Sequence, residues 1–371
     1  MKSLDVDPAT AVVRDPAALE HAMTRALARV DRARAPRYPA AQVLVSAPGF
    51  SLRSGDHARS FHSASVGKTM TGIRAYQLAE RGVLDLSAPV TTLLPAAEWR
   101  GLFRAPDAVT AAHLLAHTSG VADYFEDRAD GSVPFRDLVV RDRDTRWTPT
   151  DLLDFTRTHQ KPMADAGQRF HYSDTGYVLL ARIIEEAGGA ALGAQLHEHV
   201  FAPAGMESSC LLFHTLPGGS ASTSQTPAAD LDIAPLWIGD HDISRAASLS
   251  CDWGGGGVVT TLDDLDRFLV AWTDGRLVRP DTLARMTDGR SRFRPGIRYG
   301  SGAMRVQYGG FSPFLARMPH AIGHLGVSGA HAFTLPEAGI RLVMNFHSTR
   351  EMLRSFRTHI GLVRRAWKAL R

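Results

Sequence analysis

The chain has 371 residues, 44% of them hydrophobic and 22% charged, which is the balance of a soluble globular protein with one large or two medium domains. Its 42 basic and 38 acidic residues give a net charge of +4, too small and too scattered to indicate a nucleic acid or a membrane surface as a partner. The most basic patch lies at the C-terminus, and we interpret it as the solvated positive end of a terminal helix: Arg364, Arg365, Lys368 and Arg371.

Two cysteines, Cys210 and Cys251, are too few for a disulfide framework or a cysteine metal site, so we expect two reduced thiols. The first residues, MKSLDVDPATAVVRDP, contain no apolar stretch of the kind that exports a protein, and no run is long enough to cross a bilayer. We therefore expect a cytoplasmic protein, with a shortened exported precursor as the open alternative. The sequence does not indicate the oligomeric state.

The N-terminal part of the chain carries helix and strand signals in turn. Apolar residues recur at three- and four-residue steps over residues 16–34, which predicts an amphipathic helix. The run AQVLVSAP predicts a strand, and the Ser-Gly pair at residues 54–55 suggests the turn of a hairpin. A further helix is predicted over residues 65–81, where Gly82 supplies a C-terminal stop.

The middle of the chain, over residues 108–200, has mainly helical patterns. Thr148 followed by Pro149, with an aspartate three residues after the threonine, is a good helix start. Residues 176–187 predict a second, strongly apolar helix. Residues 125–147 are rich in aspartate and arginine, and we expect an exposed excursion there.

The C-terminal part begins with residues 212–250, which lack periodicity and predict long surface loops. Strand patterns return after residue 255 and dominate residues 297–347, and a basic amphipathic helix is predicted from about residue 349.

Strands at both ends of the chain and helices in the middle predict an α/β fold with a central antiparallel sheet flanked by helices. Residues 1–85 and 240–371 would form one discontinuous α/β domain, and residues 86–239 an inserted, mainly helical domain. The active site would lie in the cleft between the two domains.

The central chemical pattern is Ser65-Val66-Gly67-Lys68 at the predicted start of a helix. Positions three apart lie on one helix face, so the lysine can reach the serine hydroxyl. If burial and neighbouring cations lower its pKa, it can take the serine proton, and the helix N-terminus favours a developing oxyanion. Alone, such a pair is weak evidence, because it arises by chance in most chains of this length.

The surrounding segments resemble the SxxK serine hydrolases, the superfamily of serine β-lactamases, penicillin-binding proteins and related esterases. The similar segments occur in the family's order along the chain: FHSASVGK, LLAHTSGVADY, GQRFHYSDTGYVLL, FAPAGMESS, GGGGVVTTLDDLDRFL and GHLGVSGAHAF. The resemblance spans about residues 40–347 and implies a β-lactamase/transpeptidase-like fold. Within this superfamily, the sequence most resembles the class C β-lactamase and family VIII carboxylesterase branch.

The resemblance implies a role for each matching residue. Ser65 would be the nucleophile, and Lys68 its proton acceptor or electrostatic partner. Tyr172 matches the family's catalytic tyrosine, which would pass protons to the leaving group and help to activate water. The backbone N–H groups of Ser65 and Val327 would form the oxyanion hole.

Two departures from the family pattern bear on the substrate. Tyr172-Ser173-Asp174 has an aspartate where asparagine is usual, and an ionised carboxylate only accepts hydrogen bonds. Asp174 could pair with Lys68 or attract a substrate amine, and it would repel a substrate anion.

The third motif is His324-Leu325-Gly326, in which leucine replaces the threonine whose hydroxyl would bind a substrate carboxylate. The four positions Asp174, His324, Leu325 and Gly326 are therefore predicted to contact substrate. Their chemistry disfavours penicillins and D-Ala-D-Ala peptides, and it favours a neutral ester, a neutral amide or an amine-bearing acyl compound.

Other patterns favour structural roles. The glycines at 254–257 lack the spacing of a nucleotide-binding loop, so we interpret them as a crowded strand end near the site. His113 and His117 are four residues apart but lack the glutamate of a zinc protease motif, which favours a structural role over zinc binding. We predict no metal and no cofactor.

The leading hypothesis is a carboxylesterase-like serine hydrolase that forms an acyl-enzyme on a small ester or amide. A D,D-peptidase, D-aminopeptidase or β-lactamase using the same residues is the second, and acyl transfer to an amine or alcohol is the third. A noncatalytic binder is the fourth, and the presence of all three catalytic residue types counts against it.

Overall fold

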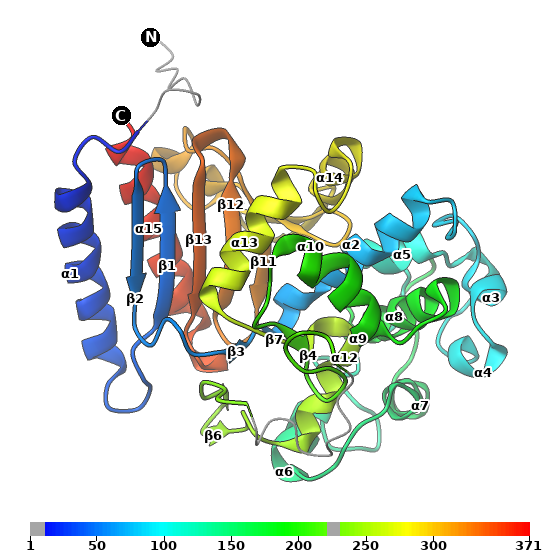
Figure 1. Ribbon diagram of the computed structural model, residues 1–371. Helices are drawn as coiled ribbons and strands as arrows, with labels where there is room; N and C mark the ends of the chain where they lie inside the picture. The colour runs from blue at the N-terminus through cyan, green and yellow to red at the C-terminus, as the bar shows by residue number, and fades with distance from the viewer. Residues whose placement is uncertain (1–11, 221–230) are drawn as a thin grey trace.

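The computed structural model describes residues 12–220 and 231–371, and its largest element is an antiparallel sheet of eight strands (Figure 1). The strand order is β2-β1-β13-β12-β11-β10-β9-β8, so the first strands of the chain lie beside the last. The bounds are β1 Gln42–Ala47, β2 Phe50–Ser54, β8 Ser291–Arg294, β9 Ile297–Tyr299, β10 Met304–Val306, β11 Ala321–Gly326, β12 Ala330–Leu335 and β13 Ile340–Asn345. The predicted α/β fold with an antiparallel sheet is confirmed.

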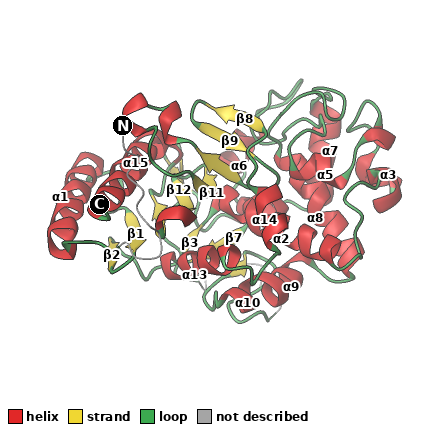
Figure 2. Ribbon diagram, turned by 90° about the horizontal axis from the view of Figure 1, so that it is seen from above, coloured by secondary structure: helices red, strands yellow, loops and turns green. Residues whose placement is uncertain are grey.

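Helices cover both faces of this sheet (Figure 2). The terminal helices α1 (Pro16–Arg34) and α15 (Met352–Ala369) pack together on one face, and α13 (Leu262–Thr273) packs on the other. Strands β11 and β12 are consequently buried at every position, since a strand covered on both faces has no solvated side.

The remaining helices mostly gather around α8, on the side of the molecule opposite α1 (Figure 1). Helix α8 is strongly apolar and packs against α2, α5 and α7. The bounds are α2 Gly67–Glu80, α3 Val90–Leu93, α4 Ala96–Trp99, α5 Ala111–Leu115, α6 Phe135–Arg141, α7 Pro149–His159, α8 Asp174–Gly188, α9 Leu192–Leu196, α10 Ala202–Ala204, α12 Trp253–Gly256 and α14 Pro280–Met286.

Two small sheets connect the helical region to the large sheet. Strand β3 (Phe61–His62) pairs with β7 (Val258–Thr260), which also pairs with β4 (Cys210–Leu211). A separate hairpin joins β5 (Trp237–Ile238) to β6 (His241–Asp242). The β3–β7 register sets His62 opposite Val259, and this pairing brings the start of α2 next to the glycine-rich turn α12.

Most predicted elements are present, but the first hairpin turns elsewhere. Strand β1 ends at Ala47 and β2 begins at Phe50, so the turn lies at Pro48 and Gly49 and not at residues 54–55. Gly49 and Gly55 both adopt φ +75°, but Gly49 lies in the hairpin turn, whereas Gly55 follows β2 and packs against the backbone of Ala41. A Ser-Gly pair is equally typical of a hairpin turn and of a bend after a strand, so the sequence does not distinguish these two structures.

Two further predictions of local structure are wrong. Residues 125–147 are not only an exposed excursion, because α6 forms within them and buries Phe135 and Val139 in the core. The glycines from residue 254 form the helical turn α12 and not a strand end, although they are as crowded as predicted. In both places a short helix is fixed by tertiary contacts and not by an extended apolar period.

The predicted helix start at Thr148 is confirmed, with Thr148 and Asp151 forming a reciprocal capping box. The division into domains at residues 85 and 240 stays a prediction. Residues 212–250 are largely loops outside the β5–β6 hairpin and a short 3₁₀ turn, and residues 221–230 lie outside the described part.

Cys210 and Cys251 are both buried free thiols, as predicted. Within residues 12–220 and 231–371, no helix has the length and apolar character needed to cross a membrane.

Candidate active site

Ser65 lies in a 3₁₀ turn, Ala64–Val66, that leads directly into α2. The preceding residue, Ala64, has φ +48°, a left-handed conformation that is costly for an alanine. Two contacts hold it there: the Ala64 N–H donates to Nδ1 of His62 at 3.2 Å, and the Ala64 carbonyl packs against Gly256. The backbone before the predicted nucleophile is therefore fixed by its surroundings.

Lys68 lies one helical turn after Ser65 and is fully buried. Its Nζ donates to Ser65 Oγ at 3.2 Å and to the carbonyl of Gly255 at 2.6 Å, and it forms an ion pair with Asp174. The expectation from the sequence that neighbouring cations would lower the pKa of Lys68 is wrong. Burial alone would lower the pKa of Lys68, but the carboxylate of Asp174, with Tyr172 and Asp252 adding to it, raises the pKa above its usual value.

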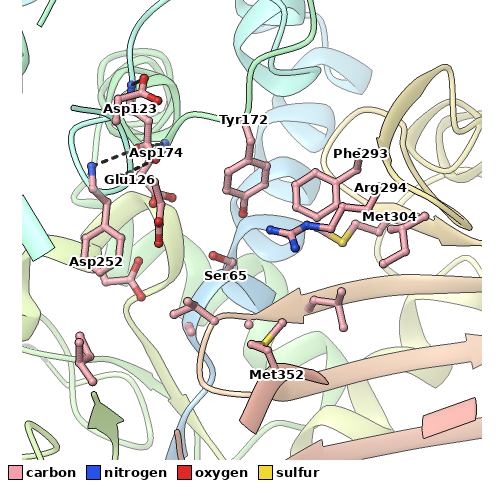
Figure 3. Close-up of a pocket in the computed structure, with 18 of the residues that line it drawn as sticks. Ser65, Asp123, Glu126, Tyr172, Asp174, Asp252, Phe293, Arg294, Met304 and Met352 are labelled. Atoms are coloured by element: carbon pink, nitrogen blue, oxygen red, sulfur yellow. Dashed lines mark hydrogen bonds between the residues drawn. The ribbon is translucent and has the colours of Figure 1, made fainter. Parts of the chain in front are cut away.

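Tyr172 faces Ser65 and Lys68 from the segment before α8, and its hydroxyl points toward Ser65 in the cavity (Figure 3). The Lys68 ammonium lies 5.1 Å from the centre of its ring. Burial raises the pKa of Tyr172, and the charge of Lys68 offsets this only in part. His117 stacks behind the tyrosine with ring centres 4.2 Å apart, and a ring in that position limits how the tyrosine can turn.

Asp174 begins α8, after Ser173 caps the helix by accepting from the Gly176 N–H. The backbone N–H of Asp174 donates to Oδ1 of Asp123 at 2.9 Å, which ties α8 to the loop after α5. Because the Asp174 carboxylate pairs with Lys68, the two charges compensate each other. A net repulsion of anions by Asp174 stays a prediction, but its charge is largely neutralised in this arrangement.

The third motif lies on β11 and the turn after it. Leu325, Gly326 and Val327 line the cavity beside Ser65. A Cβ on Gly326 would lie 2.6 Å from the Ser63 carbonyl, so only glycine lets β11 approach the nucleophile turn this closely.

His324 points away from the cavity into a buried cluster, unlike its predicted place against substrate. Its Nδ1 lies 2.7 Å from the Leu325 carbonyl and its Nε2 lies 3.4 Å from the hydroxyl of Tyr299. Burial lowers the pKa of His324 to about 3, with the charge of Lys68 adding to the shift, so the ring is neutral at pH 7. Any effect of His324 on substrate would pass through Leu325 or Tyr172.

The cavity in front of Ser65 has a volume of about 920 Å³ and is lined mostly by apolar and aromatic side chains. Figure 3 shows Ser65 and Tyr172 at its centre. Arg294, Phe293 and Met304 lie on one side of them, and Glu126 and Asp252 on the other. The cavity is thus apolar with a basic side and an acidic side.

Several cavity residues carry no signal that the sequence analysis used, among them His62, Asp252 and Arg294. His62 lies just before the Ser65 motif and Asp252 just before the glycine run, which is the only local signal for either. His62 and Asp252 lie close together because β3 pairs with β7, and no local sequence pattern predicts that pairing. Arg294 ends the edge strand β8 and resembles any surface arginine in sequence.

His113 and His117 have separate structural roles. The side chain of His113 closes the capping box of α5 with Thr110, and His117 accepts from the Ser173 N–H through Nδ1 at 3.0 Å. Among the residues in the described ranges, no cluster of three or more potential ligands could hold a metal ion.

The chain is similar in sequence to known penicillin-binding proteins and to an esterase. Penicillin-binding protein 4* of Bacillus subtilis (strain 168) is 31% identical over 150 residues, which are 39% of this chain and 29% of that protein. Esterase EstB of Burkholderia gladioli is 35% identical over 153 residues, which are 39% of this chain and 37% of that protein. These curated relatives are therefore matched over well under two thirds of their own length.

A solved D-stereospecific amidohydrolase from Streptomyces sp. matches with a TM-score of 0.72 and 25% identity, over 89% of this chain and 94% of that chain. The model of the beta-lactamase family matches residues 54–362, which include every predicted site residue. Since this match covers most of the sequence and the fold agrees with it, the chain belongs to the beta-lactamase family.

Proposed function

We propose that this protein is a serine hydrolase that acts through an acyl-enzyme on small esters or amides, with esters preferred. The observation that carries the proposal is the contact between Ser65 Oγ and a fully buried Lys68 Nζ at 3.2 Å, at the base of a largely apolar cavity. A hydroxyl held this way beside an amine and a tyrosine is the arrangement that nucleophilic catalysis needs.

In the acylation step, Ser65 Oγ attacks the substrate carbonyl carbon. Lys68 is an ammonium in the resting site, so it must first lose a proton. Transfer of one proton from Nζ to the carboxylate of Asp174 would leave a neutral amine next to Ser65, the form of the lysine that burial favours. The amine then takes the serine proton as the C–O bond forms.

The oxyanion of the tetrahedral intermediate would be stabilised by the N–H groups of Ser65 and Val327, two residues that line the cavity where β11 approaches the turn before α2. Tyr172 would donate its proton to the leaving group, and Lys68 would return a proton to the tyrosine. The leaving group then departs and Ser65 carries the acyl group as an ester.

Esters are preferred because the third motif offers no hydroxyl that could share the carboxylate of a penicillin or a D-Ala-D-Ala peptide with Arg294. Leu325 supplies no hydroxyl on the substrate-facing strand, and Glu126 and Asp252 make one side acidic. A neutral acyl group gains from the apolar walls without meeting an unfavourable charge.

A second candidate is an amidase or peptidase for amine-bearing substrates. Arg294 lies on the side of Ser65 opposite the acidic residues, so a substrate with a cationic acyl group and an anionic leaving group would match both sides of the cavity (Figure 3). The similarity to the Streptomyces amidohydrolase supports this candidate.

The proposal is tested by labelling with a fluorophosphonate and measuring the intact mass. We expect one adduct on the wild type and on Ser51→Ala, which changes an exposed serine of β2, and none on Ser65→Ala. Absence of an adduct on the folded wild type would favour a noncatalytic binder.

A substrate panel then separates the candidates. We expect p-nitrophenyl butyrate to be hydrolysed faster than D-amino-acid amides and nitrocefin, and added amines or alcohols to show whether the acyl group goes to water. Faster turnover of amides would favour the second candidate, and fast nitrocefin turnover would contradict the argument from Leu325.

A further inference from the structure

His62 and Asp252 line the same cavity as Ser65, and the proposed acylation step uses neither of them. Asp252 lies on the side of Ser65 away from Arg294 (Figure 3). His62 comes from β3 and Asp252 from the residue before α12, so their proximity results from the β3–β7 pairing.

The contacts of His62 fix the position of its proton. Nδ1 accepts from the Ala64 N–H at 3.2 Å, so Nδ1 is unprotonated and the proton is on Nε2. Burial lowers the pKa of His62 to about 4, which keeps the ring neutral. Its side chain is only 2% exposed, and among the described residues Nε2 has no hydrogen-bond partner.

An unpaired buried N–H is costly and points to an acceptor that completes the site. The nearest carboxylate oxygen, Oδ2 of Asp252, is 3.7 Å from Nε2, which is too far for a direct hydrogen bond. The 3.7 Å gap leaves no room for an atom on the line between them, but after a small movement of either side chain one oxygen atom beside that line could accept from the histidine and donate to the carboxylate. That combination of a donor and an acceptor suits a water molecule.

Asp252 is held close to the catalytic lysine by glycines. A Cβ on Gly255 would lie 3.2 Å from Lys68 Nζ and 3.5 Å from Oδ1 of Asp252, and one on Gly256 would lie 2.8 Å from Oδ2. A side chain at Gly256 would therefore displace the Asp252 carboxylate, whereas one at Gly255 would crowd Lys68 and only make ordinary contact with Asp252. These short distances explain why the glycine turn is crowded, as the sequence predicts.

The charged and titratable groups around Asp252 are His62 on β3, Lys68 on α2, Asp174 on α8, Tyr124 in the loop after α5 and the neighbouring Cys251. Burial raises the pKa of Asp252 to about 7, with the charge of Lys68 opposing the shift and that of Asp174 adding to it. Lys68 and Tyr172 have raised pKa values and stay protonated in the resting site. Asp252 is thus a cavity group that can change its protonation near neutral pH.

We propose that Asp252 is the general base of deacylation and that Nε2–H of His62 positions the attacking water. The inference rests on the proposed function, because it requires an acyl group on Ser65. Deacylation would then use Asp252 as its base, whereas acylation uses Lys68.

The step balances as follows. The water oxygen bonds to the ester carbonyl carbon while its proton passes to the Asp252 carboxylate. The tetrahedral intermediate expels Ser65 Oγ, which takes a proton from Lys68 or Tyr172, and the acyl group leaves as a carboxylic acid. Asp252 then returns its proton through solvent to the group that supplied it, so one water is consumed and the enzyme is restored.

The test is the pre-steady-state hydrolysis of p-nitrophenyl butyrate by the full chain. In Asp252→Asn we expect a burst of one equivalent of nitrophenol at a rate within about threefold of the wild type. The steady state after the burst should be slower by about 100-fold or more, the range typical of losing a general base. Intact mass should show a butyryl adduct that persists on the variant and is absent from Ser65→Ala.

The matched control is Asp137→Asn, the same change at an exposed position of α6, which should keep the wild-type burst and steady state. In the wild type, the deacylation rate should fall as the pH drops below about 7, and this dependence should be absent in Asp252→Asn. The wild-type profile alone tests the proposal if the variant does not fold.

Three results would overturn it: deacylation of Asp252→Asn within threefold of the wild type, an equal loss in burst and steady state, or a flat wild-type deacylation profile between pH 5 and 9. A wild type that is never acylated at Ser65 would instead refute the proposed function. The failure of one is therefore distinguishable from the failure of the other.

Discussion

Asp174 stands where the family resemblance leads one to expect asparagine, and the structure shows what the exchange does locally. Its carboxylate forms an ion pair with the fully buried Lys68, so the pair as a whole is neutral. An asparagine could not compensate the ammonium in this way. The substitution therefore affects the protonation of the lysine more directly than it affects the charge that a substrate meets.

Asp174→Asn should destabilise the protein at pH 7, because it leaves a buried ammonium without its partner, a change that typically costs about 3–5 kcal/mol. Without Asp174, only the smaller contributions of Tyr172 and Asp252 oppose the effect of burial, so we expect the pKa of Lys68 to lie below the value in the unfolded chain. Between these two values the unfolded chain binds more protons, so the stability of the variant rises with pH and its deficit shrinks toward pH 10.

Urea unfolding at several pH values measures this deficit. Asp137→Asn, at an exposed position, should change the unfolding free energy by less than about 0.5 kcal/mol. A deficit that is absent at pH 7, or that grows as the pH rises, would contradict the role of the ion pair.

At the scale of elements, the site depends on how closely the turn α12 approaches the turn before α2. Gly256 packs against the carbonyl of Ala64, and a Cβ on Gly67 would lie 2.9 Å from the Gly256 Cα. Because neither glycine has a side chain, the two turns meet backbone to backbone. This contact holds Ala64 in its left-handed conformation and so orients Ser65.

Gly256→Ala should therefore slow fluorophosphonate labelling of Ser65 by at least about tenfold. The new methyl group would collide with the Ala64 carbonyl and with Oδ2 of Asp252, and a small displacement of reacting groups is costly in rate. The measurement is the labelling rate followed by intact mass.

Gly361→Ala on α15 is the matched control, since its methyl group would meet only the flexible end of Arg365. It should label at the wild-type rate and be equally or more stable, because alanine favours a helix over glycine. A labelling rate for Gly256→Ala within twofold of the control would show that the turn does not position Ser65.

At the scale of the whole molecule, the fold buries many histidines in neutral form. Burial is the largest cause in each case, and it lowers the pKa to about 3 or 4 for His62, His214, His324, His347 and His359. His331 and His359 join β12 to α15 through a contact between their Nδ1 atoms at 3.2 Å. The stability of the protein in acid therefore depends in part on how the terminal helix α15 packs against β12 through these two histidines.

The protein should lose stability as the pH falls from about 6.5 toward 4. In that window the unfolded chain protonates its histidines while the folded chain does not, and each such group costs about 1.4 kcal/mol per pH unit. We expect Tm to drop by at least about 5 °C between pH 7 and pH 5.

The pH slope of Tm is the measurement. His347→Asn should reduce it, since asparagine tolerates the φ of +64° at this position, whereas the exposed His57→Gln should leave it unchanged. A Tm that is constant from pH 7 to pH 5 would contradict the neutral buried histidines.

The sequence by itself determines the elements with strong local signals. The period of residues 16–34 predicts α1 at its observed bounds, and Thr148 marks the start of α7 because capping is a contact between near neighbours. The spacing of Ser65 and Lys68 places both on one helix face for the same reason. Tyr172, Leu325 and Val327 become candidates only through the family resemblance.

Only the tertiary structure decides which charges surround those residues. The ion pair of Lys68 with Asp174, the inward turn of His324 and the closeness of His62 to Asp252 join segments far apart in the chain. A pKa depends on burial and on charges within a few ångströms, and a local pattern reports neither. The sequence therefore predicts Ser65 as the nucleophile, and the packing of β3, β7 and α12 around it decides which groups could move its protons.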